Sequence, residues 1–117
     1  MKTILIVDDE SDILSALEIV FRIEQYEVLT AANGRLALDL LNDNHPDVIL
    51  TDWMMPEMDG VAFCRAVRSD PALSAIPIIV SSAASSVPVG KPYWNRFLSK
   101  PVEIEDLLAL VHEFAMA

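Results

Sequence analysis

The sequence predicts an α/β domain built on a doubly wound parallel sheet. Short apolar runs alternate along the chain with longer segments whose apolar residues repeat at helical spacing. The runs are continuously apolar, as expected for parallel strands that helices cover on both faces. The chain has 117 residues, 53% of them hydrophobic, which is enough for one core. We therefore expect a single domain over residues 1–117.

Five short apolar runs are the expected strands. Each is four or five residues long, within the usual range for strands. Pro77 fits only the first positions of the fourth run, because proline has no N–H group to donate to a neighbouring strand. The expected strands are residues 4–7, 26–30, 47–51, 76–80 and 96–99.

Four segments have the spacing of amphipathic helices. Ser11 is expected to cap the first, since a serine side chain can accept a hydrogen bond from a free backbone N–H. Asn33-Gly34 leads into the second helix, and Gly60 opens the third, which stops near Asp70-Pro71. The last helix is expected over about residues 103–115. Strand and helix therefore alternate except between the fourth and fifth strands.

The segment between those two strands, residues 83–96, is unusual. Two prolines and a glycine lie between residues 88 and 92, and inside a helix these cost ~3 and ~1 kcal/mol relative to alanine. We expect a helix here to be missing or reduced to a short turn near Pro92. A distorted short helix is the alternative. Tyr93 and Trp94 would then either form an exposed partner-binding patch or cover the edge of the sheet.

Composition excludes several classes of function. Eighteen acidic and eight basic residues give a net charge of −10, which repels nucleic-acid backbones. The lone Cys64 excludes a disulfide framework and a cysteine-rich zinc site. No stretch approaches the ~18 consecutive apolar residues of a membrane span, and the N-terminus lacks a signal-peptide pattern. We expect a soluble cytoplasmic protein with no direct contact to nucleic acid or membrane.

Acidic residues follow two of the predicted strands. Asp8 and Asp9 end the first, and Asp52 ends the third. If the strand order is the flavodoxin-like 2-1-3-4-5, these strands are neighbours at the carboxyl edge of the sheet, where ligands bind in this class. Ser82, after the fourth strand, and Lys100, after the fifth, come to the same edge. The sequence therefore predicts one acidic pocket.

The expected chemistry follows from the charges. Neighbouring carboxylates repel one another unless a cation neutralises them or their pKa values rise. Mg²⁺ suits a site with few protein ligands and several waters, and it would neutralise charge on an incoming phosphoryl group. Asp52 would be the nucleophile that forms an aspartyl-phosphate. Lys100 and Ser82 would contact the remaining phosphoryl oxygens.

These motifs together resemble the receiver domain of response regulators over essentially the whole chain. The resemblance implies that Asp52 accepts a phosphoryl group from a phosphohistidine of a sensor histidine kinase or phosphotransfer protein. It also implies a two-component or phosphorelay switch for an unidentified downstream partner, with self-phosphorylation and autodephosphorylation as its own chemistry. The matching residues are Asp8-Asp9, Asp52 with Met55-Pro56 and Asp59-Gly60, Ser82-Ala83, and Lys100-Pro101.

The resemblance also implies a role for each site residue. Asp9, Asp52 and the backbone carbonyl of Met54 would bind Mg²⁺, and Asp8 would act partly through water. Ser82 would hydrogen-bond the phosphoryl group, and Lys100 would pair with it.

Two further residues match the family's pattern. Phe97 stands at the aromatic switch position, where its ring can swing inward when Ser82 moves. Pro101 resembles the cis-proline that follows the lysine.

Other interpretations exist for the same residues. An acid after a strand is often a cap or turn former, and Ser82 or Phe97 could be merely structural. An aspartate-nucleophile phosphatase would carry a second acid two residues after the nucleophile, where this chain has Met54. A phosphorylation-independent pseudo-receiver would lack the acidic pair or the lysine. The convergence of all these residues on one sheet edge favours the phosphorylated receiver.

Overall fold

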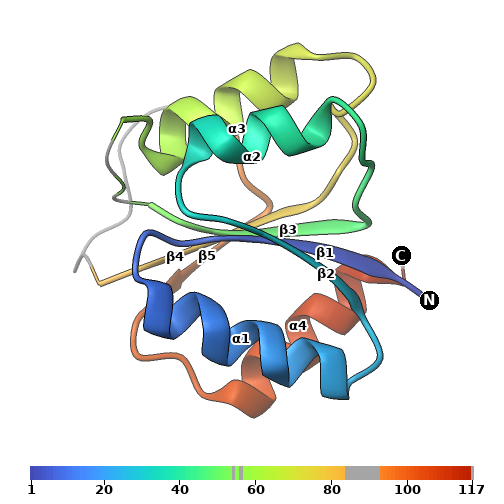
Figure 1. Cartoon of the computed structure of the whole chain (residues 1–117), viewed down its shortest axis with the longest axis vertical. Coiled ribbons are helices and arrows are strands. Elements are labelled where there is room, and N and C mark those ends of the chain that lie inside the picture. The colour runs from blue at the N-terminus through green and yellow to red at the C-terminus, as the bar shows by residue number, and fades with distance from the viewer. Residues whose placement is uncertain (54, 56, 84–92, 117) are drawn as a thin grey trace.

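The computed structural model is one five-stranded parallel sheet between two layers of helices (Figure 1). It describes residues 1–53, 55, 57–83 and 93–116. The strand order is β2-β1-β3-β4-β5. Helices α1 and α4 cover one face of the sheet, and α2 and α3 cover the other. The predicted fold class and strand order are confirmed.

The strands are β1 (Thr3–Val7), β2 (Glu27–Ala31), β3 (Val48–Asp52), β4 (Ile78–Ser82) and β5 (Arg96–Ser99). The helices are α1 (Ser11–Ile23), α2 (Gly34–Leu41), α3 (Gly60–Ser69) and α4 (Ile104–Ala115). Three strands begin one or two residues later than expected. For β4 the reason is Pro77, which has no N–H group to donate and lies just before the strand. Its carbonyl accepts a hydrogen bond from the N–H of Ile49 at 2.9 Å.

Helix α1 starts differently from the prediction. Ser11 is its first residue and Glu10 is its N-cap, with no side-chain capping bond. The N–H of Glu10 instead donates to Oδ1 of Asp8 at 2.9 Å, so the chain already turns before Ser11. The prediction that Ser11 caps this helix was therefore wrong. Asn33 and Asp59 do cap α2 and α3, by accepting the N–H groups of Leu36 and Ala62.

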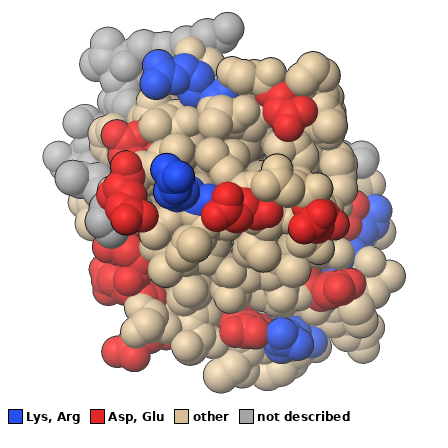
Figure 2. Space-filling model, turned by 45° about the horizontal axis from the view of Figure 1, so that its top comes forward, with Lys and Arg blue, Asp and Glu red and all other residues tan. Residues whose placement is uncertain are grey.

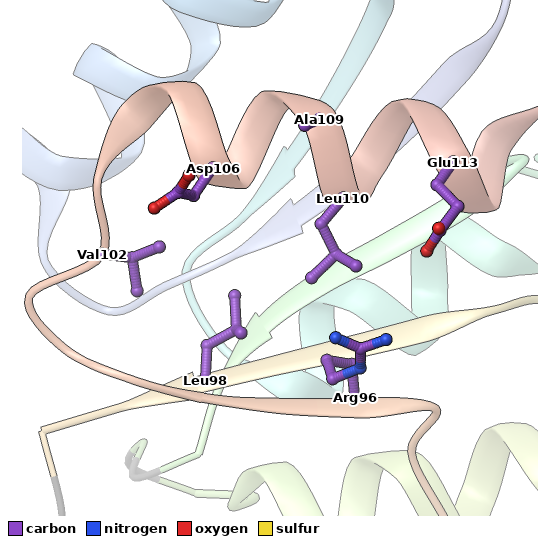
Figure 3. Close-up of a pocket in the computed structure, with 7 residues that line it drawn as sticks. All are labelled: Arg96, Leu98, Val102, Asp106, Ala109, Leu110 and Glu113. Carbon is purple, nitrogen blue, oxygen red and sulfur yellow. The ribbon is translucent and has the colours of Figure 1, made fainter.

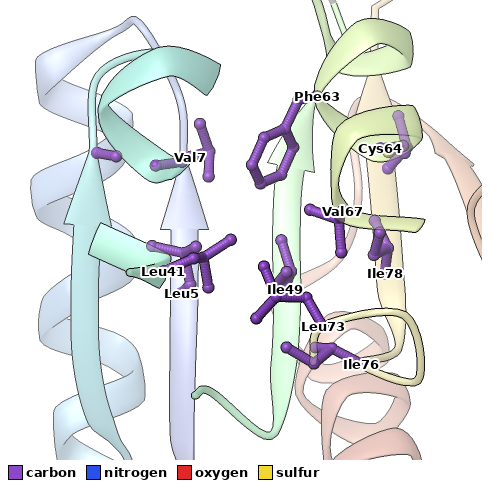
Figure 4. Close-up of a cluster of buried hydrophobic side chains, with 13 residues drawn as sticks. Leu5, Val7, Leu41, Ile49, Phe63, Cys64, Val67, Leu73, Ile76 and Ile78 are labelled. Carbon is purple, nitrogen blue, oxygen red and sulfur yellow. The ribbon is translucent and has the colours of Figure 1, made fainter. Parts of the chain in front are cut away.

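Two apolar layers hold the sheet between the helices. On one face, Leu5, Ile49 and Ile78 pack against α2 and α3 (Figure 4). The alternate strand residues face α1 and α4. Cys64 lies fully buried in the first layer, and burial raises the pKa of its thiol to about 12. The thiol therefore behaves as a packed apolar group, as protonated sulfur does in a core.

The segment between β4 and β5 is described only at its ends. Tyr93 and Trp94 are half-buried and pack against the same core layer as Phe97, which favours the interpretation that they cover the sheet. The expected loss of a helix concerns residues 84–92, which lie outside the described residues. Helix α4 is the last helix predicted near residues 103–115, and it is present. Among described residues, no helix is long and apolar enough to cross a membrane.

Arg68 joins α3 to the chain entering β5. Its guanidinium donates to the carbonyls of Tyr93 at 2.8 Å and Ile76 at 2.7 Å, and to Oδ1 of Asn95 at 2.8 Å. It also reaches the carbonyl of Ser74 at 3.0 Å. Hydrogen bonds to a charged donor are stronger than neutral ones, and here they link segments far apart in sequence. Arg68 therefore fixes where the β4–β5 segment rejoins the sheet.

Replacing Arg68 with alanine should destabilise the fold by on the order of 3 kcal/mol, because several carbonyls lose a charged donor. Chemical denaturation of the purified variant measures this loss. Arg65→Ala is the matched control, since Arg65 is an exposed residue of the same helix. Equal stabilities of the two variants would contradict the structural role of Arg68.

Candidate functional site

Three aspartates meet at the carboxyl edge of the sheet. Asp52 is the last residue of β3, and Asp8 directly follows β1, which is paired with β3. Each of Asp8, Asp9 and Asp52 offers a carboxylate oxygen, and these oxygens lie within 4.8 Å of one another. Asp8 is 3% exposed and Asp52 is 9% exposed, whereas Asp9 faces solvent. The structure thus brings together the three acids named from the sequence.

Backbone N–H groups hold the two buried carboxylates. The N–H of Glu10 donates to Oδ1 of Asp8 at 2.9 Å, and the N–H of Trp53 donates to Oδ1 of Asp52 at 2.8 Å. The backbone of Trp53 is itself fixed, because its N–H also reaches the carbonyl of Ser81 at 3.2 Å. These bonds orient the carboxylates without neutralising them.

Lys100 lies between the buried acids. Its Nζ is 3.6 Å from Oδ2 of Asp8 and 3.7 Å from Oδ1 of Asp52. Its backbone N–H donates to the carbonyl of Ser82 at 2.7 Å, and the peptide bond between Lys100 and Pro101 is cis, the form that the resemblance implies at this proline. The lysine comes from the strand end farthest along the chain, yet it reaches both acids.

The electrostatics of Asp52 are unfavourable for its charged form. Burial raises the pKa of Asp52 above its ordinary value, Lys100 lowers it, and Asp8 raises it again. Three carboxylates against one ammonium leave the cluster with two excess negative charges. The protein has a net charge of −10, and acidic side chains outnumber basic ones on the face in Figure 2. All-oxygen donors with excess negative charge suit a hard divalent cation such as Mg²⁺.

Gly60 brings α3 close behind Asp52. A Cβ atom at this position would lie 2.7 Å from the carbonyl oxygen of Asp52 and 2.8 Å from Cα of Trp53. The N–H of Gly60 donates to the carbonyl of Trp53 at 2.6 Å. A side chain here would therefore push against the backbone that carries Asp52. The turn named from the sequence, Asp59-Gly60, is thus both a helix cap and a close contact.

Three further residues were predicted for the site, and the structure describes two of them, Ser82 and Phe97. Ser82 is buried at the end of β4, one residue after Ser81, which is opposite Asp52 in the sheet. Phe97, on β5, contacts the ring of Trp53 with centroids 5.8 Å apart. Met54, whose carbonyl was expected to bind the metal, lies outside the described residues. The sheet edge thus holds the serine and the lysine.

Two hollows were not foreseen from the sequence. One, of about 540 Å³, opens beside Asp8 and Lys100 between α1 and the start of α4, with Ile13, Leu17 and Ile104 in its walls. Ile13 and Leu17 are four residues apart, the spacing of an ordinary core-facing helix stripe, so nothing in the sequence pattern indicated a groove.

The second hollow, of about 350 Å³, lies between β5 and α4. Figure 3 shows Leu98 and Leu110 pointing into it, with Arg96 on the strand side and Glu113 on the helix side. None of the site residues that the structure describes lines this hollow.

Comparisons with known proteins agree with this geometry. The sequence matches the family model of the response regulator receiver domain over residues 4–112. The transcriptional regulatory protein PrrA of Mycobacterium tuberculosis is 43% identical over 112 residues, covering 92% of this chain and 47% of PrrA. Regulatory protein AtoC of Escherichia coli is 36% identical over 110 residues, covering 92% of this chain and 24% of AtoC. The chain therefore spans less than half the length of these two relatives.

Solved structures that resemble this chain are also response regulators. The chemotaxis response regulator CheY4 of Vibrio cholerae has a TM-score of 0.87 and 33% identity, covering 97% of this chain and 98% of that one. The response regulator TrrA of Thermotoga maritima, solved in complex with Mg²⁺ and BeF, has a TM-score of 0.88 and 28% identity, covering 97% and 99%. This chain thus belongs to the response regulator receiver domain family, the signalling domains of two-component systems.

Proposed function

We propose that this domain accepts a phosphoryl group on Asp52 in a Mg²⁺-dependent reaction and thereby switches the binding of a protein partner. The observation that supports this most is the cluster of Asp8, Asp9 and Asp52 at one sheet edge with Lys100 between the buried acids. The donor is a phosphohistidine of a sensor kinase or phosphotransfer protein. The protein partner acts downstream of this domain in the signalling pathway.

The reaction is an in-line displacement at phosphorus. A carboxylate oxygen of Asp52 forms the new P–O bond, while the P–N bond of the phosphohistidine breaks and its electron pair stays on the imidazole. The N–H of Trp53 orients the attacking carboxylate through Oδ1. Asp9, Asp52 and the backbone carbonyl of Met54 would hold Mg²⁺, with Asp8 acting partly through water, and the ion would neutralise charge on the transferring group.

Lys100 and Ser82 supply the remaining contacts to the phosphoryl group. Lys100 already pairs with Asp52, so its ammonium can move from the carboxylate to a phosphoryl oxygen over a short distance. The hydroxyl of Ser82 donates to another phosphoryl oxygen, and the movement of Ser82 makes room for the ring of Phe97.

Incubation with a small phosphodonor and Mg²⁺ should add one phosphoryl group to the intact protein, because the site supplies nucleophile, metal ligands and lysine. Intact-mass spectrometry measures the adduct. Asp52→Asn should abolish it, while Asp43→Asn, at an exposed position after α2, should leave it unchanged. No adduct on the unaltered protein, or an adduct that persists in Asp52→Asn, would refute phosphorylation at Asp52.

Mg²⁺ should stabilise the protein, since an ion that binds only the folded state adds about 2.7 kcal/mol at a hundred times its Kd. Thermal unfolding with increasing Mg²⁺ measures this. Asp9→Ala should remove most of the rise in Tm because it deletes an exposed ligand of the cluster. Glu10→Ala is the matched control, because the neighbouring Glu10 contributes only its backbone N–H to the site. A similar Mg²⁺ response in both variants would place the metal elsewhere.

Without metal, Asp52→Asn should be more stable than the unaltered protein at neutral pH. The pKa of Asp52 is raised in the folded state, so between its ordinary and folded pKa the folded state holds a proton that the unfolded chain has already released. Stability of the unaltered protein should therefore fall as the pH rises from the ordinary aspartate pKa through the folded pKa, and stay lower above it. Below the ordinary pKa the penalty vanishes.

Thermal unfolding in chelator between pH 3 and 8 measures this difference, at roughly 4 °C per kcal/mol for a domain of this size. Lys100 keeps Asp8 as a partner in the variant, so no ammonium is left unpaired. The exposed Asp43→Asn should show no such gain. A variant that is less stable than the unaltered protein at pH 7 would contradict the repulsion inferred for the cluster.

A further inference from the structure

The groove beside Asp8 and Lys100 has the form of a small-molecule site. Its volume of about 540 Å³ lies within the range of ligand pockets in proteins, ~300–1,000 Å³. Helices α1 and α4 cover the same face of the sheet (Figure 1), and residues of both line the groove. Most of the lining side chains are apolar. The polar ones, Asp8, Ser81 and Lys100, stand at or near the carboxyl ends of strands.

The apolar part of the groove is made by both helices. Ile13 and Leu17 lie one turn apart on α1, and Ile104 and Leu107 come from the first turn of α4. Leu50 of β3, only 3% exposed, also lines the groove. The side chain of Ile104 is 43% exposed, so a molecule in the groove would remove apolar surface from water. These walls therefore suit an aliphatic chain.

The charges beside the groove favour a positively charged ligand over a negatively charged one. Lys100 is the one basic side chain among the described residues that line it. Its Nζ is already 3.6 Å from Oδ2 of Asp8 and 3.7 Å from Oδ1 of Asp52. An anion would therefore meet an ammonium group that two carboxylates already share. A cation would instead meet a cluster in which three carboxylates outnumber one ammonium.

Further acids accompany both walls. Asp12 precedes Ile13 on α1, while Glu103 and Glu105 flank Ile104 at the start of α4. All three acids are exposed to solvent. Together with the net charge of −10, they attract cations and repel anions approaching the groove. The same place thus combines an apolar surface with a surplus of negative charge.

We propose that this groove binds a small amphipathic cation, with an aliphatic chain against α1 and α4 and a primary ammonium group directed at Asp8. The carboxylate of Asp8 accepts the N–H of Glu10 and faces Lys100. A carboxylate has about four acceptor sites, so Asp8 has capacity for one more donor. Binding of such a ligand requires no phosphoryl group on Asp52.

Three probes with the same aliphatic chain separate the charge from the apolar part: octylammonium, 1-octanol and octanoate. Without divalent cations and at neutral pH, octylammonium should bind about ten-fold more tightly than octanol, the effect of one hydrogen bond between charged groups. Octanoate should bind more weakly than octanol. Titrations followed by the NMR signals of the backbone amides measure these affinities, and the largest shifts should fall in residues 13–17 and 102–107.

Two variants test the two parts of the groove. Ile104→Ser removes an apolar wall and should weaken the binding of octylammonium and octanol roughly three- to ten-fold. Ile19→Ser is its control, because Ile19 is 60% exposed on α1 and does not line the groove. Asp8→Asn keeps an oxygen for the N–H of Glu10 and should reduce the affinity for octylammonium to that for octanol. The exposed Asp43→Asn should not.

The probe series on the unaltered protein decides the question even if Asp8→Asn fails to fold. Preferred binding of octylammonium, with shifts in the groove that Ile104→Ser weakens and Ile19→Ser does not, supports a site for an amphipathic cation. Equal affinities of the three probes, a preference for octanoate, or shifts spread over the acidic surface would overturn it. If diluting the protein alone shifts the same signals, the groove is occupied by a second copy of the chain, which also overturns it.

Discussion

The contact of Lys100 with two buried aspartates is the interaction on which the site depends. Asp8 and Asp52 are held by backbone N–H groups in a place where water is scarce, so neither can turn away from the other. Lys100 offsets part of their repulsion, but three acids share it. The protein therefore keeps a local electrostatic strain that a divalent cation bound to this cluster would relieve. A site that is stabilised by binding its metal is less stable without it, a common compromise at functional sites.

The parallel topology explains why this strain collects at one edge. The strands β1, β3, β4 and β5 all point the same way, so the residues that follow them meet at their carboxyl ends. The acids, the serine and the lysine are far apart in the sequence, yet each needs only to stand at the end of a buried strand. The apolar runs that build the core are thus also what positions the chemistry.

The same logic explains what could be predicted from the sequence. The fold class and the meeting of Asp52, Asp8 and Lys100 follow from strand order and strand ends, which short apolar runs indicate well. The start of α1 did not follow, because Asp8 accepts the N–H of Glu10 and the turn comes before Ser11. A capping pattern shows which side chains can accept a hydrogen bond from the N–H groups at the start of a helix. It does not show whether a neighbouring carboxylate accepts a backbone N–H group just before the helix and so changes where the chain turns.

Features that depend on the angles at which helices pack on the sheet could not be predicted from the sequence. The groove beside Lys100 exists because of how α1 and the start of α4 sit on the sheet, and the spacing of Ile13 and Leu17 is the same in a closed core. Trp94 likewise had two possible places, outward or over the sheet, and its contact with Phe97 decides between them. Arg68 in turn holds the backbone carbonyl of Tyr93 and the side chain of Asn95, the two neighbours of Trp94.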